Sequence, residues 1–481
     1  MRTRTRTLPI STGLSLSLAL ALLVSLGMPV GAAQIPTNVN TSARPGNEAE
    51  DAIAINPTNP SNIVAMSVLP GPVRGTFEAV SFDGGLTWTR QVIGDGDQLG
   101  DICCDQQLAW DSFGNLWMTY LFTDSGNVPI ALSTDGGLTW QKVADVVPVK
   151  PKGVGSPKTI GSKGNQAHLR GTASADQPSI SAAAGSVWVS YTVYPSTVVQ
   201  AFGAPVTGLG QFGDFTAPQN VPTAFGKGNY GDTAVGPDGQ VMVTYQDQTI
   251  GQGGARIYTA LDRDGLGGDG FDTPQFLART RVGGFDYLPV QPHRSVDAEA
   301  SLAYDRSGGA NHGRLYAIWT QEVNNESDNM DIMFQYSDDD GATWTSAVRL
   351  NDDAGTNSQV NPSISVDQAT GFVGVAWYDA RNDLGAGGPG DTNGIPNDDV
   401  QLWATFSTDG GATFAPNFQV SAGTSNSSSA ESSFDFGDYR HSAFQSGSFY
   451  PVWSDNSNST GDNPDGTLHQ LDLYTTQVTV P

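Results

Sequence analysis

The sequence predicts an all-β fold made of repeated antiparallel units. Three observations predict it. An eight-residue motif occurs four times, a longer strand–turn–strand pattern recurs through the chain, and 58 glycines are spread among short aromatic and β-branched segments. Because such glycines favour β-turns, the pattern predicts many short strands joined by tight turns. Internal repeats of this kind determine the architecture of a long chain.

The eight-residue motif has the pattern Ser-x-Asp-x-Gly-x-Thr-aromatic. In a hairpin turn the Asp can accept hydrogen bonds from backbone amides, and the Gly tolerates a positive φ. The Thr favours a strand, and the aromatic ring can pack back under the turn. The motif therefore predicts a self-locking turn between two strands. Its copies are Ser81–Trp88, Ser133–Trp140, Ser337–Trp344 and Ser407–Phe414.

The longer repeat is a strand, a Gly-containing turn and an aromatic, β-branched strand, as in Leu108–Tyr120 and Ile364–Tyr378. A third strand then leads into the eight-residue motif or a degenerate copy, and a fourth strand leaves it. Four strands per unit are what a propeller blade requires. We therefore predict a seven-bladed β-propeller of four-stranded antiparallel blades, with six blades or a solenoid as alternatives. The residues at which the first turns begin are Asn56, Asp111, Ala183, Gly236, Asp305, Asp367 and Gln445.

The two ends of the chain predict export and ring closure. Residues 1–33 combine a basic start, the apolar stretch Leu14–Leu26 and a small-residue cleavage site, which together indicate a signal peptide. We expect a secreted protein, extracellular or periplasmic, with no membrane insertion after processing and with residues 34–481 forming one domain. The last unit ends after its third strand, so we expect Ile35–Thr41 to supply the fourth.

Charge and cysteine content narrow the classes of function. The formal net charge is −26 with only 23 Lys and Arg, which excludes the basic footprint of a nucleic-acid-binding protein. Cys103 and Cys104 are adjacent, so they can form a strained ring with each other but no disulfide framework. Zinc, dinucleotide and nucleophile-elbow motifs are missing. We expect a monomer.

The eight-residue motifs resemble the Asp boxes, or BNR repeats, of the sialidase (neuraminidase) superfamily and related propellers. At the level of the repeats the resemblance covers most of the chain. It implies a secreted propeller that acts on extracellular glycans as a glycoside hydrolase. It also implies that the boxes are structural. The site would then lie on the opposite face, where loops enter each first strand and leave each second strand.

The loops of that face carry many charged residues. Those entering first strands supply Glu50, Asp51, Asp101, Asp105, Asp176, Asp232, Arg294, Asp297, Glu299, Asp438, Tyr439 and Arg440, and those leaving second strands include Asp379 and Arg381. Carboxylates facing one axis repel each other and raise each other's pKa unless arginines or a bound cation intervene.

The resemblance assigns roles to some of these residues. Sialidases bind the substrate carboxylate with three arginines and use a Tyr–Glu pair as nucleophile with an Asp as acid/base, an exception to the two-carboxylate scheme. Matching positions here are Arg294, Arg381 and Arg440 with Asp379 for binding, and Tyr439, Glu299 and Asp101 or Asp51 for catalysis. The chain departs from that family in lacking its Arg-Ile-Pro motif and in having seven units. The sialidase hypothesis requires the three arginines in one pocket with Tyr439 near Glu299.

Two other functions fit the same face. One is a non-catalytic propeller that binds a glycan, a protein or calcium. The other is a polysaccharide lyase using neighbouring Tyr439, Arg440 and His441. Tyr439 and Arg440 would point to opposite sides of an extended strand. No cofactor is required, but calcium suits the oxygen-rich segments Asp262–Asp272 and Asp391–Asp399. The candidate calcium ligands are Asp262, Asp264 and Asp269.

Overall fold

A computed structural model describes residues 1–2, 35–71, 73–122, 125–149, 173–224, 226–247, 252–284 and 286–480. The chain divides into two compact units, Met1–Gln34 and Ile35–Pro481, and the fold below is that of the second. Almost all of the predicted signal peptide lies outside the described residues, so it stays a prediction. Within the described ranges, no helix is long and apolar enough to cross a membrane.

The second unit is built from seven antiparallel sheets, each with four strands in the order first, second, third, fourth. The predicted seven-bladed propeller is therefore confirmed. The first three blades have these strands: β2 (Ala49–Ile55), β3 (Ile63–Val68), β4 (Thr76–Ser81) and β5 (Thr89–Ile93); β7 (Gly100–Trp110), β8 (Leu116–Phe122), β9 (Val128–Ser133) and β10 (Gln141–Val146); β11 (Ser174–Ala183), β12 (Ser186–Tyr194), β13 (Val198–Gly208) and β15 (Gln219–Asn220).

The remaining blades follow the same plan. Blades four to six contain β16 (Thr233–Val235), β17 (Val241–Gln246), β18 (Ala255–Asp262) and β19 (Gln275–Thr280); β22 (Ser301–Tyr304), β23 (Leu315–Glu322), β24 (Met330–Ser337) and β25 (Val348–Arg349); β26 (Gln359–Val366), β27 (Val373–Asp379), β28 (Asp399–Ser407) and β29 (Phe418–Gln419). The seventh contains β31 (Ser442–Gln445), β32 (Ser448–Asp455), β33 (Asp472–Thr475) and β1 (Val39–Asn40). Short additional elements are β6 (Asp95–Asp97), β14 (Gln211–Phe212), β20 (Asp286–Leu288), β21 (Gln291–Val296), β30 (Ser425–Asn426), β34 (Val478–Thr479) and the 3-10 turn Ser427–Ala430.

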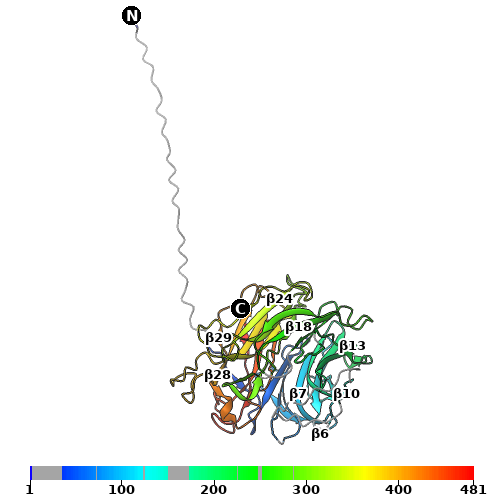
Figure 1. Ribbon diagram of the computed structural model, residues 1–481, viewed down its shortest axis with the longest axis horizontal. Coiled ribbons are helices and arrows are strands. Elements are labelled where there is room, and N and C mark those ends of the chain that lie inside the picture. Colours follow the sequence, from blue (N-terminus) through cyan, green and yellow to red (C-terminus); the bar gives the residue numbers. More distant parts are fainter. Residues whose placement is uncertain are drawn as a thin grey trace. The chain divides into compact units, whose positions relative to one another are not determined.

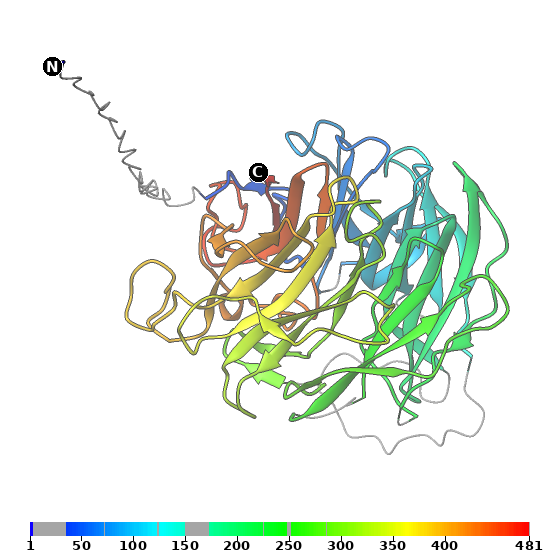
Figure 2. The same ribbon diagram turned by 90° about the horizontal axis from the view of Figure 1, so that it is seen from above.

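The first strands of the blades surround a common axis. Each of them contacts the first strand of the next blade, and β31 of the last blade contacts β2 of the first. The ring is closed by β1, which pairs antiparallel with β33 through Val39↔Thr475 and Asn40↔Tyr474. The blue N-terminal and red C-terminal strands accordingly lie together in Figures 1 and 2. The predicted closure by the N-terminal segment is confirmed.

Aromatic residues of the second strands fill the space between blades. Deleting a buried Trp side chain typically costs about 3–5 kcal/mol, so these strands carry much of the packing energy. The longer sequence repeat arises from the alternation of β-branched and aromatic residues in these second strands. The tryptophans buried there are Trp117, Trp188, Trp319, Trp377 and Trp453.

The four eight-residue motifs form the same turn between a third and a fourth strand. In the first copy, the Ser81 hydroxyl donates to Asp83 Oδ1 at 2.8 Å and accepts the Gly85 N–H at 2.8 Å. Asp83 Oδ1 also accepts the Thr87 N–H at 2.9 Å, and these bonds lower the pKa of Asp83 to about 2. Equivalent bonds recur in the other three copies. The predicted self-locking turn is present in each.

Candidate functional site

Six residues before each first turn begins, regular pairing of the inner strand is interrupted or has not yet started. Strands β2, β7, β11 and β26 have a bulge at this position, and in the other three blades the equivalent residue lies just before the first strand. Counting back from the seven turn positions gives Glu50, Asp105, Gln177, Tyr230, Glu299, Asn361 and Tyr439, which we call the bulge ring. All of these except Tyr439 have positive φ angles, between 34° and 57°. Non-glycine residues in that region cost on the order of 1–3 kcal/mol each and concentrate at functional sites.

The bulge ring lies at the end of the propeller opposite the eight-residue motifs. A first strand runs from its bulge to its first turn, and the third strand runs in the same direction before reaching the motif turn. The two kinds of turn therefore share one end, and the bulges lie at the other. This is the face on which the sequence predicted the site.

Six buried or half-buried carboxyl groups gather at the bulge ring and influence one another electrostatically: Glu50, Asp105, Asp176, Asp297, Glu299 and Asp438. We call them the acid cluster. Burial is the main cause of the altered titration of five of them: Glu50, Asp105, Asp176, Asp297 and Glu299. It raises the pKa of Glu50 and of Asp105 to about 8 and that of Asp176 to about 6, and mutual repulsion adds to each increase.

Arg294 is the counter-ion of the acid cluster. Its Nη2 donates to Glu50 Oε1 at 2.9 Å, its Nε donates to Asp438 Oδ1 at 2.7 Å, and Nη2 also contacts the second oxygen of Asp438. Across the described ranges, no other Arg or Lys side chain forms an ion pair with Glu50, Asp105, Asp297, Glu299 or Asp438. Glu50 and Asp438 therefore share Arg294 as their counter-ion.

An inserted hairpin brings Arg294 to the axis. Strands β20 and β21 form a separate two-stranded sheet between the fourth and fifth blades, and Arg294 lies on β21. Buried Asp435 holds this hairpin, because its Oδ2 accepts the N–H groups of His293 at 2.7 Å and Arg294 at 2.8 Å. Asp435 is thus a positioning residue for the arginine.

A cavity opens beside the acid cluster, and its empty volume of about 560 Å³ includes space that is open to solvent. Several buried polar atoms of its lining have no hydrogen-bond partner: Gln177 Oε1, Asp297 Oδ1, Glu299 Oε2 and the Tyr439 hydroxyl. Since buried polar groups are normally hydrogen-bonded, a lining with several unpaired atoms is typical of a ligand site. Asp438, Arg440 and His441 also line it.

Two acids of this cavity have contrasting surroundings. Burial, reinforced by repulsion from Asp297 and Asp438, raises the pKa of Glu299 well above its usual range. Asp438 instead accepts hydrogen bonds from the guanidinium of Arg294. Burial and the nearby carboxylates also raise the pKa of Tyr439, which keeps its hydroxyl protonated.

Tyr439, Glu299 and Arg440 therefore line one cavity, as the sialidase hypothesis required, but the three-arginine pocket is not formed. Arg381 is held by its neighbours: Nε donates to Asp379 Oδ2 at 2.9 Å and Nη1 donates to Asp352 Oδ1 at 2.8 Å. Its guanidinium carbon also lies 4.1 Å from the centre of the Trp403 ring. Arg381 and Asp379 do not line the cavity.

The other predicted catalytic acids lie elsewhere. Asp101 pairs with Arg74 beside the short strand β6. Asp51 is fully buried between blades and accepts hydrogen bonds from the Ser67 hydroxyl at 2.9 Å and the Ser454 hydroxyl at 2.7 Å. Burial raises its pKa to about 7. Neither residue lines the cavity.

Arg440 lies beside Tyr439 in the cavity wall, although alternation along a strand predicted opposite sides. Both residues precede β31, whose regular pairing begins only at Ser442, so the alternation of a paired strand does not apply to them. Arg440 has unpaired Nε and Nη2 atoms, and burial lowers its pKa to about 10. Sequence reasoning did not name Gln177 or Asn361. The signal that finds them is the constant spacing of six residues before each turn.

The predicted calcium ligands Asp262 and Asp264 lie close enough for a side-chain hydrogen bond. Asp264 Oδ2 caps its own turn by accepting the Gly268 N–H at 2.9 Å and the Asp269 N–H at 3.3 Å, while Asp262 accepts from Gln219 at 3.2 Å. In the part of the chain that the structure describes, the group with three carboxylate oxygens within 4.8 Å of one another is Asp383, Asp391 and Asp399. It overlaps the second oxygen-rich segment. These carboxylates accept backbone N–H groups, which accounts for their role in shaping the loop.

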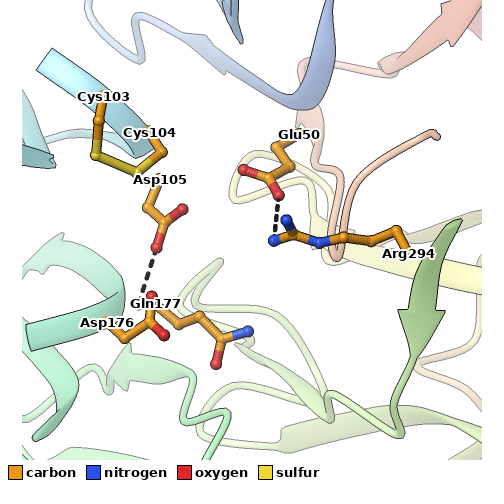
Figure 3. The surroundings of a disulfide bond; sticks show 7 residues. All are labelled: Glu50, Cys103, Cys104, Asp105, Asp176, Gln177 and Arg294. Carbon is orange, nitrogen blue, oxygen red and sulfur yellow. Dashed lines mark hydrogen bonds and ion pairs between the residues drawn. A yellow bond between two sulfur atoms is a disulfide. The ribbon is translucent and has the colours of Figure 1, made fainter. Parts of the chain in front are cut away.

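Cys103 and Cys104 are joined in a disulfide, one of the states expected from their adjacency. Figure 3 shows the pair directly before Asp105 in the chain, with Glu50, Asp176 and Arg294 nearby. The Gln177 N–H donates to Asp105 Oδ2 at 2.9 Å and to Asp176 Oδ1 at 3.2 Å. One backbone amide therefore holds two acids of the cluster together.

No protein family matches the sequence, and no curated protein does. Several solved structures are similar at low identity. An α-L-arabinanase from Penicillium chrysogenum is 14% identical over 78% of this chain and 98% of its own, with a TM-score of 0.43. A Hadza microbial sialidase is 14% identical over 87% and 73%, with a TM-score of 0.42. A lectin from Burkholderia pseudomallei is 12% identical over 78% and 84%, with a TM-score of 0.46. Similarity at this level assigns no function, so function is argued from the cavity.

Proposed function

We propose that this chain is a glycoside hydrolase that cleaves glycans in the cavity beside the acid cluster. Glu299 would act as the general acid, and Asp438 would act as the carboxylate that serves as base or nucleophile. The observation that carries the proposal is the contrast between the two acids of one cavity. Burial and repulsion raise the pKa of Glu299, and the Asp438 carboxylate accepts hydrogen bonds from the Arg294 guanidinium. Glycosidic cleavage needs one protonated and one ionised carboxyl group.

The reaction would proceed with the glycosidic oxygen next to Glu299. Glu299 donates its proton to that oxygen as the bond to the anomeric carbon breaks. Asp438 either attacks the anomeric carbon or removes a proton from the water that does so. The unpaired Tyr439 hydroxyl and Gln177 Oε1 are placed to bind sugar hydroxyl groups. Removal of a general acid typically slows such a reaction by about 10²–10⁴-fold.

The charge of the site favours a neutral glycan over a sialic acid or a uronate. Arg294 is already bonded to Glu50 and Asp438, and Arg381 lies outside the cavity. Among the described residues that line the cavity, Arg440 is the arginine, and its Nε and Nη2 are unpaired. An anionic sugar would meet net repulsion there. The predicted signal peptide supports a glycan outside the cell as the substrate.

The test compares leaving groups. We expect Glu299→Gln to lower kcat on a neutral oligosaccharide by about 10²-fold or more, because the leaving alcohol needs a proton. On the matching nitrophenyl glycoside the loss should be much smaller, since nitrophenolate leaves without one. Glu78→Gln is the control, because Glu78 is also buried with a pKa raised to about 8 but bonds to Gln91 and Trp140 away from the cavity.

Equal losses on the two substrates would remove Glu299 from the role of general acid. An inactive wild type on a broad panel of neutral glycosides would leave glycan binding without catalysis as the function of the cavity. Turnover of sialosides alone would contradict the charge argument.

A further inference from the structure

The disulfide between Cys103 and Cys104 lies on β7, directly before Asp105 of the bulge ring (Figure 3). Both cysteines are half-buried and pack against an apolar cluster that includes Leu121 of blade two and Ala175 of blade three. Because neither residue is fully buried, the disulfide lies within reach of solvent.

The disulfide coincides with an irregularity that β7 does not share with the other bulged strands. The register between β7 and β8 shifts twice, between Ile102 and Cys104 and between Cys104 and Gln107. The registers of β2, β11 and β26 with their second strands each shift once, at the bulge itself. Neighbouring side chains of a regular strand point to opposite faces, whereas a disulfide needs Cβ atoms about 3.5–4.5 Å apart. The bond between adjacent cysteines therefore keeps β7 out of regular pairing at Cys103.

The three residues that follow the disulfide connect it to two neighbouring blades and to the cavity. Asp105 Oδ2 accepts the Gln177 N–H of blade three at 2.9 Å. Gln106 Nε2 donates to the Glu50 carbonyl oxygen of blade one at 2.8 Å. Gln107 and Gln177 both line the cavity. A change in the backbone at the two cysteines is therefore transmitted to the cavity wall on both sides of blade two.

We propose that the Cys103–Cys104 disulfide is a thiol–disulfide switch that controls the shape of the cavity. The disulfide form holds Asp105 and Gln106 on their partners in the neighbouring blades. Reduction removes the restraint at Cys103, so β7 can pair with β8 as regularly as the other bulged strands pair, and Asp105 then leaves the Gln177 amide.

The reductant is an external dithiol. One of its sulfur atoms attacks the disulfide as a thiolate and forms a mixed disulfide, which its second thiol then displaces. The S–S bond of the protein breaks, and Cys103 and Cys104 gain two electrons and two protons to become thiols. The dithiol loses the same electrons and protons and becomes a disulfide.

The test is hydrogen exchange of the full chain, followed by mass spectrometry, with and without dithiothreitol. The sequence contains two cysteines, so this disulfide is the one that the reagent can reduce. We expect two new thiols per chain and exchange that is about fivefold faster or more in peptides covering β7 and the start of β11, because losing one hydrogen bond changes an opening equilibrium by about that factor. Peptides covering β26, whose bulge at Asn361 has no cysteine beside it, should exchange at an unchanged rate.

The variant that combines Cys103→Ser with Cys104→Ser is the control. It should exchange rapidly in β7 and β11 whether or not dithiothreitol is present. Two new thiols with unchanged exchange in β7 and β11 would overturn the proposal, as would a disulfide that dithiothreitol does not reduce. So would equal acceleration in β26. If the double variant does not fold, the comparison of oxidised with reduced wild type decides alone.

The effect of the switch on catalysis rests on the proposed function. Hydrolysis of neutral oligosaccharides should fall by about tenfold or more on reduction, because small displacements in a cavity wall impair the positioning of substrate. It should recover on reoxidation with oxidised glutathione, and the double variant should stay slow throughout. Unchanged hydrolysis by the reduced protein would overturn control of the cavity. An oxidised protein that hydrolyses no glycan would refute the proposed function, and hydrogen exchange would still decide the switch.

Discussion

Replacing Arg294 with Met should expose how much the acid cluster depends on its counter-ion. The change leaves the Glu50 and Asp438 carboxylates buried without their ion pair. Removing one partner of a buried pair typically costs about 3–5 kcal/mol. For the unit Ile35–Pro481, an unfolding entropy of roughly 2.1 cal/mol/K per residue gives about 1 kcal/mol per kelvin. The expected fall in Tm is therefore about 3–5 °C at alkaline pH.

The loss should depend on pH with a definite sign. Without Arg294 the two carboxyl groups can avoid an unpaired charge only by binding protons, which is easy at pH 5.5 and costly at pH 8.5. The Tm difference between wild type and variant should therefore be small at pH 5.5 and widen as the pH rises. Scanning calorimetry at the two pH values, with EDTA present, measures it.

Two controls separate the loss of the buried ion pair from a general effect of removing an arginine. Arg263→Met removes a pair with Asp272 whose side chains are 65% and 51% exposed, and exposed pairs are worth about 0–1 kcal/mol. Adding Glu50→Gln and Asp438→Asn to Arg294→Met should remove the pH-dependent part of the loss. An Arg294→Met protein that is as stable as wild type at pH 8.5, or whose loss is equal at both pH values, would refute the reasoning.

Three further predictions concern the fold. Gly411→Ala should lower the free energy of unfolding by about 2 kcal/mol or more, because φ is +82° and a Cβ would lie 2.6 Å from Phe334. Gly84→Ala should lower it by only about 1 kcal/mol, because φ is +75° but no atom lies closer than 3.8 Å. Urea unfolding of the two variants measures the difference. Between pH 4.5 and about 8 the folded state holds a proton on Glu78 that the unfolded state has lost, so the stability of the wild type falls as the pH rises. The stability of Glu78→Gln relative to wild type should therefore increase by about 1.4 kcal/mol per pH unit in that window. A difference that does not change with pH would contradict this prediction. Deleting residues 35–41 removes β1 and leaves the edge of β33 unpaired. The deletion should lower Tm and cause concentration-dependent association through that edge, which light scattering detects. A deletion variant with unchanged Tm and no association would contradict closure by β1.

The number of blades and the ring closure could be predicted because both follow from short sequence patterns. The repeated turns count the blades, and the missing last strand at the C-terminus points to the N-terminal segment that replaces it. The hydrogen bonds of the motif at Asp83 are also local, since they lie within a few residues of one another. Each of these features depends on neighbours along the chain.

The site was less predictable because its members meet across blades. Arg381 could be placed after a second strand, but its capture by Asp379 and Asp352 depends on a contact across 29 residues. Arg294 reaches the axis only because Asp435, 141 residues away, holds the inserted hairpin. Tyr439 and Arg440 line the same cavity because both precede the paired part of β31, and strand alternation could not reveal where that pairing begins.

The most direct test of the central claim is release of reducing ends from neutral oligosaccharides by wild type and Glu299→Gln, measured side by side at pH 6. The account predicts turnover by wild type that falls by about 10²-fold or more in the variant, with Glu78→Gln retaining the wild-type rate. Equal rates for wild type and Glu299→Gln would contradict it, as would activity confined to sialosides.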